Sequence, residues 1–243
     1  MEGIRSVVGV DGPVATRDWT ETVSRFIVGA AFVVILLGIG RELLVAFVGT
    51  GTVLQEGRHF DLDREGTLPA WFSGSLLLMS AALAGVFALF DSRDGFINRR
   101  PWIVLGVILV FLSLDEVASF HEAILQVVSD SVGFDGPLQF VWIAVVPILF
   151  FLGLFFWRFL LRLPPETRRK IWLAGALYIS GAIGFEMVSG AVEAAGIDRS
   201  AAAYRAAIVV EETLEVSGLV LVLVALLSYA RMLGIKLVSR SRG

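Results

Sequence analysis

Acidic side chains lie inside three long apolar stretches of this 243-residue chain. An ionised group in such surroundings is energetically costly, so its presence is by default a functional hypothesis. The acids concerned are Asp115, Glu116 and Glu122 in the first stretch, Glu186 and Glu193 in the second, and Glu211, Glu212 and Glu215 in the third. Carboxylates bind hard cations and transfer protons, so the chemistry to expect is metal binding or acid–base catalysis.

The spacing of these acids places them in stripes along helices. An α-helix turns by about 100° per residue, so residues seven or four positions apart share a face. The pairs at these spacings are Asp115 with Glu122, Glu186 with Glu193, and Glu211 with Glu215. Ser119 falls on the face of the first pair, and Glu116 and His121 flank that face on either side. We therefore expect three helices to present acidic stripes to one shared site.

So many carboxylates in a small dry space cannot all be ionised, because like charges and burial both favour the protonated form. Shared protons, pairing with Arg41 or bound cations would relieve the charge, and one arginine is too few. The composition therefore favours a bound divalent metal, with shared protons as the alternative. The predicted metal ligands are Asp115, His121, Glu122, Glu186, Glu193, Glu211 and Glu215. Oxygen ligands with at most one imidazole suit manganese, iron, magnesium or calcium, and Glu116 or Glu212 would be the general base.

The overall composition restricts the class of protein. Hydrophobic residues make up 56% of the chain, charged residues 18%, and the mean hydropathy is +0.80, which excludes an ordinary cytoplasmic enzyme and a disordered chain. A net charge of −3 gives no basic field for a nucleic-acid partner. The absence of cysteine excludes an iron–sulfur cluster, two histidines exclude a bis-histidine haem, and Lys170 and Lys236 lie outside the apolar runs, which excludes a retinal Schiff base.

Apolar runs of about 20 residues are long enough to cross a bilayer, and in lipid they must be helical. The sequence predicts an all-α, six-helix transmembrane bundle at residues 25–231, with tails at 1–24 and 232–243. The predicted spans are residues 25–48, 70–90, 101–128, 138–161, 171–195 and 205–231. The chain is thus expected to be a multi-pass protein of the cell membrane, in contact with membrane lipids.

The distribution of basic residues predicts the orientation of these spans. Fifteen of the 20 Lys and Arg lie in the amino-terminal segment through Arg25, in the loops at 91–100 and 158–170, and in the segment from Arg231 to the end, so the positive-inside rule places both termini in the cytoplasm. At about 1.5 Å per residue, the acids then fall in the outer half of the bilayer. Asp115, Glu186 and Glu215 form a deeper tier, and the other acids lie nearer the outer surface.

Several smaller features have more than one interpretation. Arg41 and Glu42, in the outer half of the first span, form either a structural ion pair or part of the site. The acids of loop 49–69 favour a solvated acidic loop, with a lid or substrate-access role left open. Ser119 and Ser189 are expected to bond back to their own helices. The small residues Ser180, Gly181, Gly184 and Gly190 are expected to permit close helix packing.

Two segments carry a resemblance to known proteins. They are Phe60-Asp-Leu-Asp-Arg-Glu-Gly-Thr-Leu-Pro-Ala-Trp-Phe-Ser73 and Leu112-Ser-Leu-Asp115-Glu-Val-Ala-Ser-Phe-His121-Glu122. The sequence resembles a family of uncharacterised prokaryotic multi-pass membrane proteins, which implies a shared fold and no named activity. In general layout it also resembles membrane hydrolases related to alkaline ceramidase, whose zinc is held by several histidines, whereas this chain has one histidine inside a predicted span.

Three functions fit these observations. The first is a metal-dependent membrane enzyme that acts on a lipid or another amphiphile at the outer leaflet. The second is a cation or proton-coupled transporter, a common use of carboxylates inside a membrane. The third is a non-catalytic sensor or assembly subunit whose acids hold helices together. A nearly uncharged inner half in every span favours the first over the second.

Overall fold

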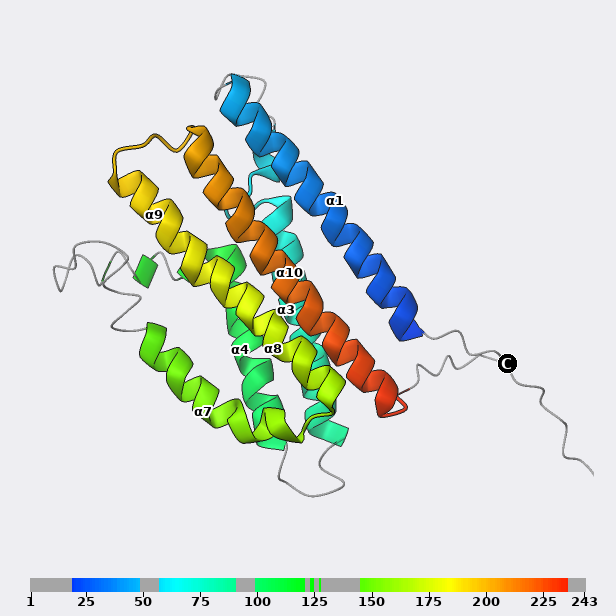
Figure 1. The fold of residues 1–243 in the computed structure, drawn as a ribbon. Helices are drawn as coiled ribbons and strands as arrows, with labels where there is room; N and C mark the ends of the chain where they lie inside the picture. Colours follow the sequence, from blue (N-terminus) through cyan, green and yellow to red (C-terminus); the bar gives the residue numbers. More distant parts are fainter. Residues whose placement is uncertain are drawn as a thin grey trace, which may run out of the picture.

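The computed structural model describes residues 19–48, 57–90, 99–120, 123–124, 127 and 145–235. Regular structure in these residues is entirely helical, with no strand, which confirms the all-α class (Figure 1). The elements are α1 (Trp19–Val48), η1 (Gly57–Phe60), α3 (Leu68–Phe90), α4 (Arg99–Ala118), α7 (Val146–Arg162), α8 (Pro165–Ile179), η3 (Ser180–Phe185), α9 (Glu186–Ala194) and α10 (Ala202–Met232).

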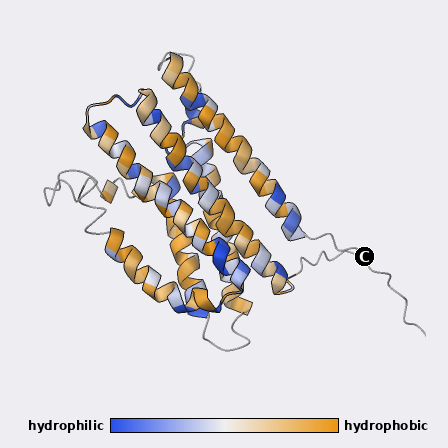
Figure 2. Cartoon of the chain, viewed as in Figure 1, coloured by the Kyte–Doolittle hydropathy of each residue, from blue (hydrophilic) through white to orange (hydrophobic). Residues whose placement is uncertain are grey.

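Five of the described helical segments are long and apolar enough to cross a membrane. They are Trp19–Phe47, Leu68–Phe90, Arg99–Ala118, Pro165–Ala194 and Ala202–Met232. Hydrophobic residues extend along most of the length of these segments (Figure 2). The fourth predicted span is represented by α7, whose 17 residues cover about 25 Å, and residues 138–144 lie outside the described part. The described part of the chain is therefore all-α, with five segments that could cross a membrane.

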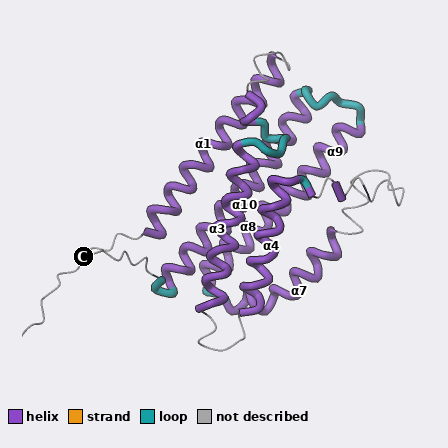
Figure 3. The backbone as a smooth tube through the Cα atoms, turned by 180° about the vertical axis from the view of Figure 1, so that it is seen from behind, coloured by secondary structure: helices purple, strands orange, loops and turns teal. Residues whose placement is uncertain are grey.

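Helix α10 is the centre of the bundle. It contacts α1, α3, α8, η3 and α9, while α3 packs against α4. The two views place α1 and α7 on opposite sides of the bundle (Figures 1 and 3). Beyond Glu215 every buried residue of α10 is apolar or glycine, and Leu219, Leu223 and Leu226 are among them. This half of α10 therefore forms a dry hydrophobic core with its neighbours.

Aromatic side chains fill the bundle near the amino-terminal end of α4. The ring of Trp102 lies 4.8 Å from the rings of Phe87 and Phe159 and 5.6 Å from that of Tyr229, between ring centroids. These distances are typical of favourable aromatic contacts, and both Phe87 and Trp102 are buried. The cluster fills the end of the bundle at which α3 ends and α4 begins.

Two of the predicted spans are irregular where the sequence predicts continuous helices. The predicted helix 101–128 ends as α4 at Ala118, because Ser119 adopts a left-handed backbone with φ 52°. The Ser119 N–H still donates to the Asp115 carbonyl at 2.9 Å, and the Ala123 N–H donates to the Ser119 carbonyl at 3.2 Å. The predicted helix 171–195 instead consists of α8, the π-helical segment η3 and α9. Such irregularities occur frequently at functional sites.

Two glycines allow the α8–η3 segment to approach α10 closely. A Cβ at Gly181 would lie 2.6 Å from Cγ of Glu215 and 2.7 Å from the Glu211 carbonyl oxygen. A Cβ at Gly218 would lie 2.8 Å from the backbone nitrogen of Tyr178. The expected packing role therefore holds at Gly181, whereas a Cβ at Gly184 would have open space, and Gly218 was not foreseen.

Candidate functional site

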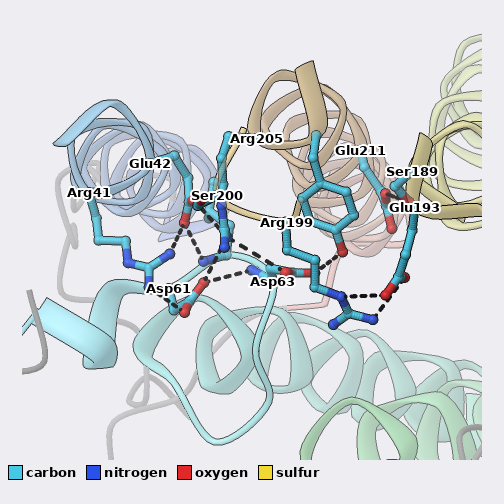
Figure 4. A network of polar contacts seen from close by, with 12 residues as sticks. Arg41, Glu42, Asp61, Asp63, Ser189, Glu193, Arg199, Ser200, Arg205 and Glu211 are labelled. Atoms are coloured by element: carbon cyan, nitrogen blue, oxygen red, sulfur yellow. Dashed lines mark hydrogen bonds and ion pairs between the residues drawn. The ribbon is translucent and has the colours of Figure 1, made fainter. Parts of the chain in front are cut away.

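A network of ion pairs joins the end of α1 to the start of α10 and to the loop between η1 and α3 (Figure 4). Glu42 of α1 is its centre, with 1% of its surface exposed. Its Oε1 accepts hydrogen bonds from Nη1 of Arg41 at 2.8 Å and from the N–H of Leu62 at 3.3 Å. Its Oε2 accepts from Nη1 of Arg205 at 3.1 Å. We call Arg41, Glu42, Asp61, Asp63, Tyr204 and Arg205 the ion-pair network.

The loop acids complete this network. Nη2 of Arg41 lies 2.6 Å from Oδ2 of Asp61, and Nη1 of Arg205 lies 3.6 Å from Oδ2 of Asp63. The hydroxyl of Tyr204 donates to Oδ1 of Asp63 at 3.1 Å. Each loop carboxylate is therefore bound by a side chain from a long helix.

Burial shapes the ionisation of the loop acids. Burial raises the pKa of Asp61, an effect that Arg41 opposes and the charge of Glu42 reinforces. Burial also raises the pKa of Asp63, against the opposing charge of Arg205. Burial is thus the largest influence on the pKa of both carboxylates, ahead of the attraction of any single arginine.

The interpretation of this loop as a solvated acidic segment is wrong for Asp61, although Arg58, His59 and Arg64 in the same loop are exposed. Asp61 is buried, and Leu62 packs with Tyr204 and Ile208 and over Gly38 of α1. One feature of the sequence pointed to the ion-pair network: an arginine, Arg205, at the start of an apolar run. Nothing in the sequence identifies the distant residues with which it pairs. Arg41 and Glu42 were expected to form either a structural ion pair or part of the site, and the structure contains the ion pair.

A second group of acids lies further along α10. Glu215 interacts electrostatically with Glu116 of α4, Glu186 of α9 and Glu211 of its own helix. Glu212 interacts in the same way with Glu116, Glu211 and Glu215. Residues from three helices thus lie close enough for their charges to influence one another. We call Asp115, Glu116, Glu186, Glu211, Glu212 and Glu215 the carboxylate cluster.

Tyr178 of α8 connects Asp115 to this cluster, because its hydroxyl is influenced by Asp115 as well as by Glu116, Glu212 and Glu215. The two irregular helix segments adjoin the same place. Ser119 follows Glu116 by three residues, and η3 ends directly before Glu186. All members of the cluster are partly exposed rather than fully buried.

Ser189 of α9 and Asp63 of the ion-pair network both interact with acids of the carboxylate cluster. The Ser189 hydroxyl donates to the Glu186 carbonyl at 3.0 Å, as expected, and its oxygen lies 3.2 Å from Oε2 of Glu211. The charge of Asp63 also acts on Glu211 and Glu212. The ion-pair network therefore adjoins the outer side of the carboxylate cluster.

The structure separates one predicted ligand from the others. Glu193 accepts two hydrogen bonds from Arg199, each of 2.9 Å, in an exposed salt bridge at the end of α9 (Figure 4). His121 and Glu122 lie outside the described residues. Among the described residues, no three acidic or histidine side chains have the spacing of a formed metal site. The metal-ligand roles therefore stay predictions.

The fold and these polar groups define a class: an all-α protein whose long apolar helices could span a membrane and have carboxylates gathered between them. Residues 25–230 match the family described as a domain of unknown function, DUF8692, and the chain belongs to this family. No curated protein and no solved structure matches the chain. The family is uncharacterised, as the sequence resemblance implies.

Proposed function

We propose that the carboxylate cluster is a cation-binding active site and that the protein is a metal-dependent enzyme acting on a lipid or another amphiphile. The observation that carries this proposal is the convergence of Glu116, Glu186 and Glu215 from three different helices. Carboxylates grouped in a low-dielectric region are most readily accommodated with a bound cation or shared protons. Divalent metals held by oxygen ligands activate water or polarise an ester or phosphoryl group.

The apolar half of the bundle supports an enzyme with access from one side. The buried residues of α10 beyond Glu215 are apolar or glycine, and the aromatic cluster around Trp102 fills the end of the bundle beyond them. The acids and the ion-pair network lie toward the opposite end. With both termini in the cytoplasm, as we propose from the arginine distribution, the site faces the outer leaflet.

The roles within this site follow from position. Glu186 and Glu215 would be metal ligands with Asp115 and Glu211, and His121 and Glu122 would add ligands from the segment after α4. Glu116 and Glu212 are the remaining carboxylates of the cluster, so one of them would be the general base that takes a proton from water.

A lipid-conversion assay tests the enzymatic proposal. Purified protein is incubated with a total membrane lipid extract, with and without a chelator, and products are identified by mass spectrometry. We expect time-dependent conversion of one lipid class that the chelator abolishes, and that Glu116→Gln or Glu212→Gln reduces by 100-fold or more, in the range of a lost general base (about 10²–10⁴). Glu193→Gln, outside the cluster, should retain full activity. Conversion unaffected by the chelator and by both variants would overturn the proposal.

The helix irregularities favour a second candidate, a cation or proton-coupled transporter. Transporters commonly place their ion sites at interrupted helices, and here the left-handed Ser119 and the π-helical η3 both adjoin the acids. Ion flux into proteoliposomes that Glu186→Gln abolishes would support this candidate. Absence of flux, together with lipid conversion, would exclude it.

A further inference from the structure

The corner where α7 ends and α8 begins is strongly basic. Residues 158–170, all of them described, contain five basic side chains and a single acid, Glu166. The basic residues are Arg158 and Arg162 on α7, and Arg168, Arg169 and Lys170 on α8. This corner lies at the opposite end of the bundle from the ion-pair network (Figure 1).

Two of these basic residues hold the corner together. Nη1 of Arg168 donates to the Leu161 carbonyl at 3.1 Å, which ties α8 to the last turn of α7. Nζ of Lys170 donates to Glu166 at 2.7 Å and approaches the hydroxyl of Ser228 on α10 at 3.4 Å. The one acid of the corner is therefore already engaged.

The other three basic residues are exposed and available. Arg158, Arg162 and Arg169 are exposed and form no hydrogen bond or ion pair with the described residues, although the charge of Arg169 acts on Glu166. Arg158 and Arg162 are four positions apart, so they share a face of α7. The positive charges of Arg158 and Arg162 therefore extend from the corner without a partner among the described residues.

Two exposed tryptophans accompany these arginines. The rings of Trp157 and Trp172 lie 6.0 Å apart between centroids, and the residues are 53% and 46% exposed. Arg158 follows Trp157 directly, and Arg169 precedes Trp172 by three positions on the same side of α8. The ring contact shows that these turns of α7 and α8 lie side by side, so the exposed arginines of both helices belong to the same corner of the bundle. Exposed tryptophan is typical of the boundary between acyl chains and headgroups.

We propose that this corner binds an anionic phospholipid. The guanidinium groups of Arg158, Arg162 and Arg169 would bind the phosphate, because arginine forms charge-assisted hydrogen bonds with phosphate oxygens. The indoles of Trp157 and Trp172 would contact the glycerol and upper acyl region. Two exposed indoles beside unpaired arginines suit a ligand with an anionic head and an apolar body, and not a soluble phosphate. This inference is independent of the carboxylate cluster.

Native mass spectrometry of the purified full-length chain tests the inference. The protein is mixed with phosphatidylglycerol or phosphatidylcholine of the same acyl chains, and the fraction that retains lipid is measured. The test variant is Arg158→Gln/Arg169→Gln. The control is Arg25→Gln/Arg199→Gln, which removes the same charge from two arginines that pair with Glu21 and Glu193 elsewhere in the chain. A third arm replaces the lipid by glycerol phosphate.

We expect the wild type and the control to retain phosphatidylglycerol at least about tenfold more strongly than phosphatidylcholine, and the test variant to lose this preference. Trp157→Leu should weaken retention of both lipids. Equal retention of the two lipids by the wild type, or an unchanged preference in the test variant, would overturn the proposal. Glycerol phosphate that displaces the lipid at equal concentration would overturn it as well, because the site would then be specific for phosphate alone.

Discussion

Nη1 of Arg205 lies 3.1 Å from Oε2 of Glu42, although 163 positions separate the two residues in the chain. Glu42 is the buried centre of the ion-pair network, and Arg205 is 9% exposed. Their pairing joins the last helix to the first at the end of the bundle where the loop after η1 docks. The carboxylate cluster begins about two turns further along α10. The ion-pair network therefore fixes the position of the helix ends next to the carboxylate cluster.

Replacing Arg205 should destabilise the protein strongly. Methionine keeps the length of the side chain but leaves Glu42 and Asp63 without one of their cations in a buried setting. Breaking one side of a buried ion pair costs about 3–5 kcal/mol, and we expect the lower end because Arg41 still contacts Glu42. Thermal or denaturant unfolding in detergent measures the loss.

The matched control for this change is Arg25→Met. Arg25 pairs with Glu21 on the exposed surface of α1, so its loss should cost less than about 1 kcal/mol. Equal effects of the two substitutions would mean that the network contributes no more than a surface ion pair.

Adding a methyl group at Gly181 should disturb the contact between η3 and α10. Its Cβ would overlap Cγ of Glu215 and the Glu211 carbonyl oxygen, so we expect Gly181→Ala to cost about 1–3 kcal/mol. Gly184→Ala, three positions along, would meet no atom within 4 Å and should be neutral or slightly stabilising. A comparison of the two unfolding temperatures checks this, and the reverse order would refute the close approach.

The raised pKa of Asp63 predicts a definite sign of pH dependence. Between its ordinary pKa of 3.8 and the raised value, the folded protein binds more protons than the unfolded chain. This contribution to stability is complete below pH 3.8 and is lost as the pH rises through the raised pKa. Since asparagine cannot ionise, the stability difference between wild type and Asp63→Asn should fall as the pH rises across this window.

Asp198→Asn is a control for which the pH dependence of stability should have the opposite sign. Hydrogen bonds from the Ser200 hydroxyl and N–H lower the pKa of Asp198, so its contribution is present above pH 3.8 and is lost as the pH falls through the lowered pKa. Unfolding temperatures measured at a series of acidic pH values distinguish the two. If the difference in unfolding temperature between wild type and Asp63→Asn did not change with pH, burial would not raise the pKa of Asp63.

The left-handed backbone at Ser119 predicts how this position responds to substitution. A left-handed conformation costs an L-residue about 1–2 kcal/mol, and glycine is free of this cost. Ser119→Gly should therefore preserve or raise the unfolding temperature, whereas the β-branched Ser119→Val should lower it. If valine is tolerated as well as glycine, the break after α4 is not maintained in solution.

The sequence was sufficient to predict the helical class and the apolar spans, because these depend on local composition. The acids of the cluster were also identified in this way, since Glu116, Glu186 and Glu215 are conspicuous in apolar runs. The break at Ser119 was missed because serine is a common helix residue, and its conformation depends on the surrounding helices.

The ion-pair network could not be predicted for a different reason. Pairing of Glu42 with Arg205 and of Arg41 with Asp61 depends on which helix ends meet, and a single sequence carries no such information. Likewise, Glu193 lies seven positions after Glu186, so helical spacing alone places both acids on the same face of the helix. Its separation from the cluster depends on Arg199 in the following loop, which binds it at the surface.

The metal content of the purified protein tests the central claim most directly. Wild type, Glu186→Gln, Glu215→Gln and the control Glu193→Gln are purified without chelator at neutral pH, and their divalent metals are measured by elemental analysis. We predict near-stoichiometric metal in the wild type and in Glu193→Gln, and strongly reduced metal in both cluster variants. A wild type that binds no metal, even after incubation with manganese, iron, magnesium or calcium, would contradict the proposed metal centre.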